Sequence, residues 1–165
     1  MQEKINVYLS ARISQDAHSW NTEVCSHLTA PFNVFLPHMH NPWNMKHEDL
    51  PREVYAMDLQ AMKSSHMALL LPAYGRDCAW EAGWYANSNK PLVVFLDTQT
   101  EWLRDWMVKG GVDYVLTNNP ITFRLLQEDP IVSNCSKLIN DISCIHQEML
   151  EIYERAYIRN ENYAA

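Results

Sequence analysis

Three carboxylates in or next to two expected helices are the side chains of this sequence best placed to do chemistry. The segment 78–88 has helical spacing, and Glu81 falls in or just after its first turn. The amide dipoles there favour a negative charge and would keep Glu81 ionised, which suits a carboxylate nucleophile rather than a general acid. Asp77 precedes this helix and either caps it or reaches the same pocket as Glu81. Spacing alone leaves open that Glu81 is an exposed carboxylate that only stabilises the helix.

The third carboxylate, Asp58, interrupts the inward face of a second expected helix at residues 51–65. The rest of that face is apolar or small: Val54, Ala61, Met62 and Ser65. Because a buried charge is costly unless it is paired, Asp58 is either a structural partner of a helix end or an arginine, or a functional group.

Short apolar runs alternate with helical patterns along the chain, which indicates a parallel β-sheet covered by helices. The expected strands cover residues 5–10, 34–36, 67–71 and 92–96, with a fifth at 112–116. The expected helices between them cover residues 17–30, 51–65, 78–88 and 99–108. Right-handed crossovers would place these helices on both faces of the sheet. The sequence therefore predicts an α/β fold, a three-layer sandwich with a five-stranded, mostly parallel sheet.

Residues that follow the expected strands are candidates for ligand contact, because open parallel sheets bind ligands beyond the carboxyl ends of their strands. Ser10 and Arg12 follow the first strand, and His38 and His40 follow the second. The helix at 78–88 would bring its first turn to this edge by packing closely on the sheet through small side chains. These are spaced i, i+3, i+4 and i+7: Ala79, Ala82, Gly83 and Ala86.

The chain is expected to form a single domain over residues 1–165, with 47% hydrophobic residues to build one core. After Pro120 the pattern is helical and predicts a long C-terminal helix from about 131 to 159. Its apolar stripe consists of Leu138, Ile142, Ile145, Met149 and Ile152. We expect this helix to pack on the domain or on another subunit.

Charge and composition narrow the classes of partner, the location and the kinds of site that we expect for this protein. A formal net charge of −7 without a stripe of Lys and Arg works against a nucleic-acid polymer as partner. No apolar run is long enough to cross a membrane and no signal-peptide core is evident, so we expect a soluble, cytoplasmic protein. The four cysteines form no CxxC pair, which favours reduced thiols. His38 and His40 could point toward one ion, but no carboxylates recur at ligand spacing, and no metal site is expected.

Three segments together resemble the nucleoside 2-deoxyribosyltransferase family and its N-glycosidase relatives. They are the opening Val7-Tyr8-Leu9-Ser10-Ala11, the helical Asp58-Leu59-Gln60-Ala61-Met62 and the stretch DCAWEAGWYANSNKPL from Asp77 to Leu92. The most specific feature is Glu-x-Gly-x-x-Ala followed by Lys-Pro and an apolar strand. The resemblance covers residues 5–97.

The resemblance implies a flavodoxin-like fold in which Glu81 is the nucleophile, Asp58 is the helix carboxylate beside it and Tyr8 is the phenol that orients it. It also implies an aspartate that handles the base. Asp77 matches that aspartate, although it lies nearer to Glu81 than the family's aspartate does. The resemblance further implies a homo-oligomer and no organic cofactor.

Further substrate contacts are expected beside these catalytic groups. Arg12 stands where the family commonly has Gly-Pro, and with Ser10 and Ser14 nearby it could bind a 5′-phosphate, the alternative being a surface ion pair. The indole rings of Trp20, Trp43 and Trp80 could stack on a planar base.

Three functions are compatible with these residues. The first is exchange of the base of 2′-deoxyribonucleosides through a covalent glutamyl-deoxyribose intermediate, with a nucleoside or nucleotide and a free nucleobase as substrates. The second is hydrolysis of nucleosides or nucleoside 5′-monophosphates, if water attacks the intermediate. The third is a non-catalytic nucleotide-binding module, because fold alone does not guarantee chemistry.

Overall fold

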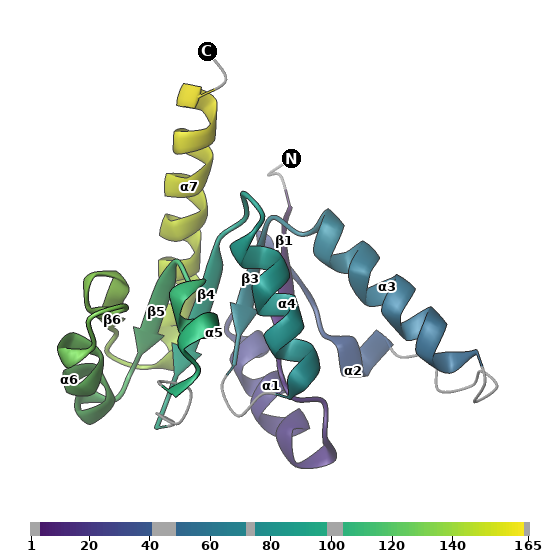
Figure 1. The fold of residues 1–165 in the computed structure, drawn as a ribbon, viewed down its shortest axis with the longest axis horizontal. Coiled ribbons are helices and arrows are strands. Elements are labelled where there is room, and N and C mark those ends of the chain that lie inside the picture. The colour runs from purple at the N-terminus through teal and green to yellow at the C-terminus, as the bar shows by residue number, and fades with distance from the viewer. Residues whose placement is uncertain (1–3, 41–48, 72–74, 99–103, 164–165) are drawn as a thin grey trace.

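The computed structural model describes residues 4–40, 49–71, 75–98 and 104–163, with side chains up to residue 157. Within these ranges the strands form one parallel sheet in the order β2-β1-β3-β4-β5-β6 (Figure 1). The strands are β1 (Ile5–Ser10), β2 (Phe32–Phe35), β3 (Met67–Leu70), β4 (Leu92–Leu96), β5 (Tyr114–Thr117) and β6 (Ser136–Leu138). The expected α/β class is confirmed, and β6 extends the expected five-stranded sheet at the β5 edge.

Helices connect the strands near the expected places, except that the helix expected at residues 99–108 begins at Trp106, and residues 99–103 lie outside the described residues. The α-helices are α1 (His18–Ser26), α2 (Pro37–His40), α3 (Leu50–Ser64), α4 (Arg76–Ala86), α5 (Trp106–Gly110), α6 (Pro120–Glu128) and α7 (Ile145–Tyr163). Short 3-10 helices are η1 (Gln15–Ala17), η3 (Ser133–Cys135) and η4 (Ile142–Cys144). Within the described residues, none of these helices has the length and apolar composition needed to span a bilayer.

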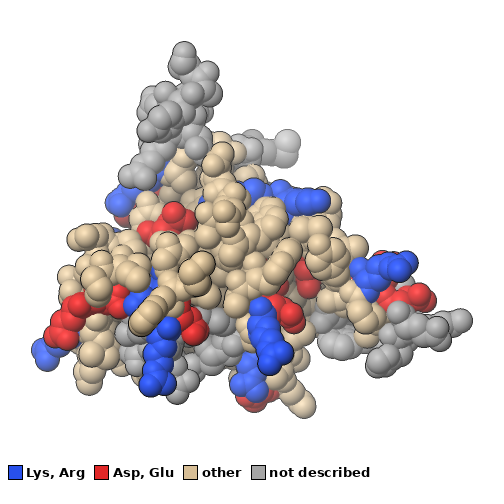
Figure 2. All heavy atoms as spheres, viewed as in Figure 1, with Lys and Arg blue, Asp and Glu red and all other residues tan. Residues whose placement is uncertain are grey.

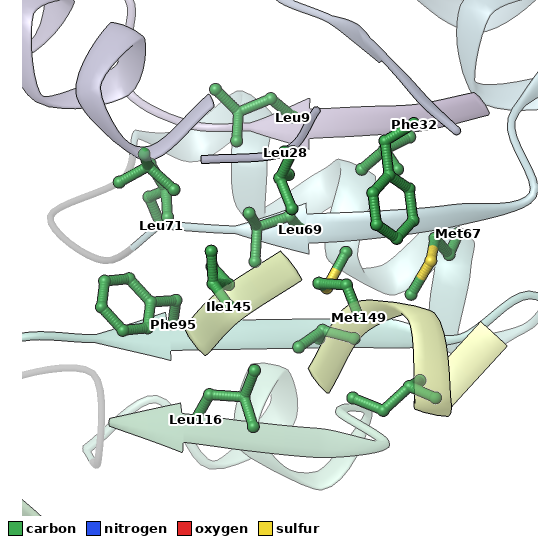
Figure 3. Close-up of a cluster of buried hydrophobic side chains, with 14 of the residues drawn as sticks. Leu9, Leu28, Phe32, Met67, Leu69, Leu71, Phe95, Leu116, Ile145 and Met149 are labelled. Carbon is green, nitrogen blue, oxygen red and sulfur yellow. The ribbon is translucent and has the colours of Figure 1, made fainter. Parts of the chain in front are cut away.

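Two buried clusters on opposite faces of the sheet make the three layers. Because side chains alternate along a strand, Val7 and Leu9 face one side while Tyr8 faces the other. The first side packs against α1 and α7, and Figure 3 shows Ile145 and Met149 of α7 over the strands. The second side packs against α3 and α4 through buried Met62, Cys78, Ala82 and Tyr85. The three-layer arrangement is therefore confirmed.

The surface mixes the two signs of charge. Figure 2 shows Lys and Arg interspersed with Asp and Glu on the face that carries α4 and α5, and the described residues of this face form no continuous basic stripe.

The expected C-terminal helix from 131 to 159 is wrong in its first half. Residues 136–138 form β6, which pairs with β5, and α7 begins only at Ile145. The Asp141 side chain accepts hydrogen bonds from Ser143 and so holds a separate 3-10 turn ahead of α7. Of the expected apolar stripe, the residues on α7 pack in the core: Ile145, Met149 and Ile152.

Helix α4 is rotated relative to the expected small-residue packing. Gly83 and Ala86 are exposed, whereas Glu81 and Tyr85 are buried against the sheet. A Cβ atom at Gly83 would meet no atom within 4 Å, so no close approach depends on this glycine. The rotation turns Glu81 toward β1 instead of toward solvent.

A tight approach occurs instead at Gly111, where a Cβ atom would lie 2.7 Å from the Ala86 Cβ. We expect Gly111→Ala to lower the free energy of unfolding by about 1–3 kcal/mol, because α4 and the end of α5 would have to separate. Gly83→Ala is the matched control and should raise it by about 0.5–1 kcal/mol, since an open helix position gains from alanine. Urea unfolding of both variants tests this; similar changes in both would contradict the packing at Gly111.

Candidate active site

Glu81 lies buried between α4 and β1, with only 9% of its surface exposed. The Tyr8 hydroxyl donates to its Oε1 at 2.7 Å, and the Ser10 hydroxyl donates to its Oε2 at 2.6 Å. The Tyr8 ring is itself fixed by stacking on Phe35, with ring centroids 5.7 Å apart. Two residues of one strand thus hold the carboxylate in one orientation.

Burial and hydrogen bonding act in opposite directions on Glu81. Burial raises its pKa above the ordinary value, the hydroxyls of Ser10 and Tyr8 lower it, and the nearby Asp77 raises it. Glu81 lies beyond the first turn of α4, which begins at Arg76. The helix dipole was expected to keep Glu81 ionised. In the structure, two hydroxyl donors favour the Glu81 anion by direct hydrogen bonds instead.

Asp58 points from α3 toward the same place with an unsatisfied oxygen. Its Oδ1 atom is buried and has no hydrogen-bond partner among the described residues. Burial, together with the charges of Glu81 and Asp77, raises the pKa of Asp58 to about 6, and His40 opposes this shift. Asp58 can therefore hold a proton in mildly acidic solution, unlike an ordinary aspartate.

A cleft of about 630 Å³ joins the three expected carboxylates, Asp58, Asp77 and Glu81. Its other walls come from the loop after β1, the start of α2, and the facing surfaces of α3 and α4. These walls include Ala11, Arg12, Ile13, Ser14, Pro37, Pro51, Val54, Tyr55, Leu59, Met62, Gly75, Cys78 and Trp80. The cleft lies at the carboxyl end of β1, where parallel sheets bind ligands.

One aromatic residue from each of α3 and α4 lines this cleft, and the two rings contact each other. Tyr55 of α3 and Trp80 of α4 are about half exposed, and their ring centroids are 6.2 Å apart. Trp80 was expected to contact a base, whereas no such role was predicted for Tyr55. Its position three residues before Asp58, on the same face of one helix, was the available signal.

Asp77 and Arg12 line the cleft at its exposed rim. Asp77 lies in the first turn of α4, and the residue before the helix is Gly75, so Asp77 does not cap it. Arg12 forms a loose i, i+4 ion pair with Asp16, at 3.6 Å, and both side chains are largely exposed. The surface ion pair expected as the alternative for Arg12 is therefore present, and the same side chain also lines the cleft.

The other expected substrate contacts lie elsewhere. Trp20 stacks on Phe95 in the α1 layer, with ring centroids 6.1 Å apart, so the structure does not bring it to the cleft. Trp43 lies outside the described residues. Ser10 is buried behind the cleft wall and contacts Glu81.

Thiol and metal chemistry find little support in the described part of the chain. Burial raises the pKa of the Cys78 thiol to about 11, so Cys78 stays protonated at neutral pH although it lines the cleft. No three His, Cys, Asp or Glu side chains among the described residues are grouped so that they could hold a metal ion.

Comparisons with known proteins bear on the family and the fold of the chain. Residues 4–100 match a family model described as "Nucleoside 2-deoxyribosyltransferase like". Among solved structures, the chain resembles a 2-deoxyribosyltransferase from the psychrotolerant bacterium Bacillus psychrosaccharolyticus, with a TM-score of 0.55 and 19% sequence identity over 67% of this chain and 84% of that one. A comparison with curated proteins gives no match. The family model spans more than half of the chain, and the chain therefore belongs to the nucleoside 2-deoxyribosyltransferase-like family.

Proposed function

We propose that this protein is a nucleoside 2-deoxyribosyltransferase, which exchanges the base of a 2′-deoxyribonucleoside through a covalent intermediate on Glu81. The observation that carries the proposal is the Glu81 carboxylate, held by two buried hydroxyls and facing a cleft large enough for a sugar and a base. Membership of the family supports the same chemistry. Assembly into a homo-oligomer and a cytoplasmic location remain predictions.

In the first half-reaction, a Glu81 oxygen forms a bond to C1′ while the C1′–N bond breaks. Positive charge develops on the sugar in an oxocarbenium-like transition state, and the adjacent anion stabilises it. The electron pair of the broken bond goes to the base nitrogen, and the base takes a proton from Asp58. Asp58 suits this role because burial and neighbouring charges raise its pKa to about 6.

In the second half-reaction, a nitrogen of another free base attacks C1′ and Glu81 leaves as a carboxylate. The proton that the incoming base loses returns to Asp58, so both carboxyl groups recover their initial states. Tyr55 and Trp80 would face the planar ring of either base. Covering of the cleft by the base would exclude water and favour exchange over hydrolysis.

Hydrolysis of nucleoside 5′-monophosphates is the second candidate, and two residues at the cleft favour it. Arg12 lines the cleft with an exposed guanidinium group, and the Ser14 side chain lines it beside Arg12. A guanidinium and a hydroxyl are suitable groups for a 5′-phosphate. Water would then replace the second base as the group that attacks C1′.

The first test is incubation of the protein with a 2′-deoxyribonucleoside and a different free base. We expect the exchanged nucleoside as product, and intact mass spectrometry should show one deoxyribosyl group on the protein when the acceptor base is omitted. Glu81→Ala and Glu81→Gln should lower turnover by roughly four orders of magnitude or more and form no adduct, while keeping the fold. Free deoxyribose as the main product would favour hydrolysis, and near-native rates in both variants would remove Glu81 from the mechanism.

Asp58 should set the upper pH limit of the reaction rate. The rate is expected to fall as pH rises through about 6, because Asp58 then loses the proton that the departing base needs. Asp58→Asn should abolish this limb of the kcat/KM profile and lower kcat by about 10²- to 10⁴-fold. Asp77→Asn is the control and should keep the limb. If only Asp77→Asn abolishes it, the proton comes from Asp77.

A substitution of Arg12 tests whether the cleft binds the phosphate of nucleoside 5′-monophosphates. If the cleft takes 5′-monophosphates, Arg12→Ala should raise KM for them by roughly tenfold or more, with little change for the nucleoside, because a charged hydrogen bond is lost. Arg155→Ala is the matched control, since Arg155 forms a similar i, i+4 ion pair on α7. Equal changes for nucleoside and nucleotide would reject a phosphate contact at Arg12.

A further inference from the structure

Two hydroxyls on one strand divide the oxygens of Glu81 between them. Tyr8 and Ser10 occupy alternate positions of β1, so their side chains point to the same face of the sheet, toward α4. Tyr8 donates to Oε1 and Ser10 donates to Oε2, at 2.7 and 2.6 Å. Because each oxygen has its own donor, the carboxylate cannot rotate without losing a hydrogen bond.

Ser10 has no route to the substrate. Its side chain is 0% exposed, whereas the next residues along the chain, Ala11 and Arg12, line the described part of the cleft. Its hydroxyl proton points to Glu81, so it is not available to a 5′-phosphate. The short distance and the full burial are those of a charge-assisted hydrogen bond in a dry environment.

We propose that Ser10 is a positioning residue for the nucleophile: it fixes the orientation of the Glu81 carboxylate and keeps it ionised, without contacting substrate. This inference rests on the proposed function of Glu81. Nothing in the residue pattern assigned this role to Ser10, which was expected to bind substrate. The physical reason is that a carboxylate taken out of water depends on local donors to remain an anion.

Several other titratable groups face Glu81 and must be separated from the effect of Ser10. They are Tyr8 from β1, Asp58 from α3, and Asp77, Cys78 and Tyr85 from α4. Burial raises the pKa values of the phenols and the thiol, so these groups stay neutral where a glutamate titrates. Asp58 and Asp77 are carboxyl groups, so the titration of Glu81 has to be observed directly.

The test compares Ser10→Ala with Ser65→Ala. Ser65 is also a buried serine, but its hydroxyl contacts Tyr85 and the Met62 carbonyl rather than Glu81. The pKa of Glu81 is measured by ¹³C NMR of the labelled carboxyl group in protein without substrate, with Glu81→Gln to assign the signal. The pH dependence of kcat/KM is measured in parallel, together with KM for a 2′-deoxyribonucleoside and for its 5′-monophosphate.

For Ser10→Ala we expect the pKa of Glu81 and the acid limb of kcat/KM to move upward together, by about one pH unit or more. At neutral pH, kcat should fall roughly tenfold to a hundredfold through loss of orientation, with both KM values little changed. Ser10→Thr restores the hydroxyl and should bring both values back. Ser65→Ala should leave the pKa of Glu81 where it is.

Two results would overturn the proposal: an unchanged pKa of Glu81 in Ser10→Ala, or a selective rise in KM for the 5′-monophosphate with the acid limb in place. The second result would return Ser10 to a phosphate-binding role. If the wild-type protein shows no turnover, the proposed function fails, but the NMR titration still decides whether Ser10 keeps Glu81 ionised.

Discussion

The structure depends on how the free-energy cost of burying one carboxylate, that of Glu81, is offset. Glu81 is nearly excluded from water, and burial by itself favours its neutral form. The hydroxyls of Tyr8 and Ser10 offset part of this cost, and β1 places both on the face of the sheet that packs against α4. The rotation of α4 about its axis follows from the same requirement, because only this rotation brings Glu81 to the two donors and leaves Gly83 at the surface.

The position of Asp58 depends on a separate set of hydrogen bonds at the C-terminal end of α3. The Lys90 ammonium group donates to the carbonyl oxygens of Met62, Lys63 and Ser65, at 3.0, 2.6 and 2.5 Å. These carbonyls end α3, where a positive charge is favourable. Lys90 precedes β4, so the Lys-Pro pair of the sequence ties α3 to the strand that follows α4. The two helices that carry Asp58 and Glu81 are in this way fixed to the same part of the sheet.

The sequence was informative where one local pattern decides the outcome. The first four strands follow from apolar runs, and Asp58 stands out because a charge breaks the inward face of its helix. Prediction failed where distant residues decide. Leu138 continues a helical stripe, yet it pairs in a strand because Thr117 offers a partner edge. Trp20 follows the first strand closely but turns to the opposite face, and Ser10 gains its partner from a residue 71 positions away.

Two carboxyl groups in one cleft can divide acid and nucleophile only if their surroundings differ, and here they do. Burial raises the pKa of both groups, and the charge of Glu81 further raises the pKa of Asp58. Glu81, however, receives two hydroxyl donors, which stabilise its anion, while the buried Oδ1 of Asp58 receives none from the described residues. When the pair holds a single proton, that proton therefore belongs on Asp58. In the proposed mechanism, the arrangement that prepares Glu81 to attack C1′ thus also leaves Asp58 prepared to protonate the departing base.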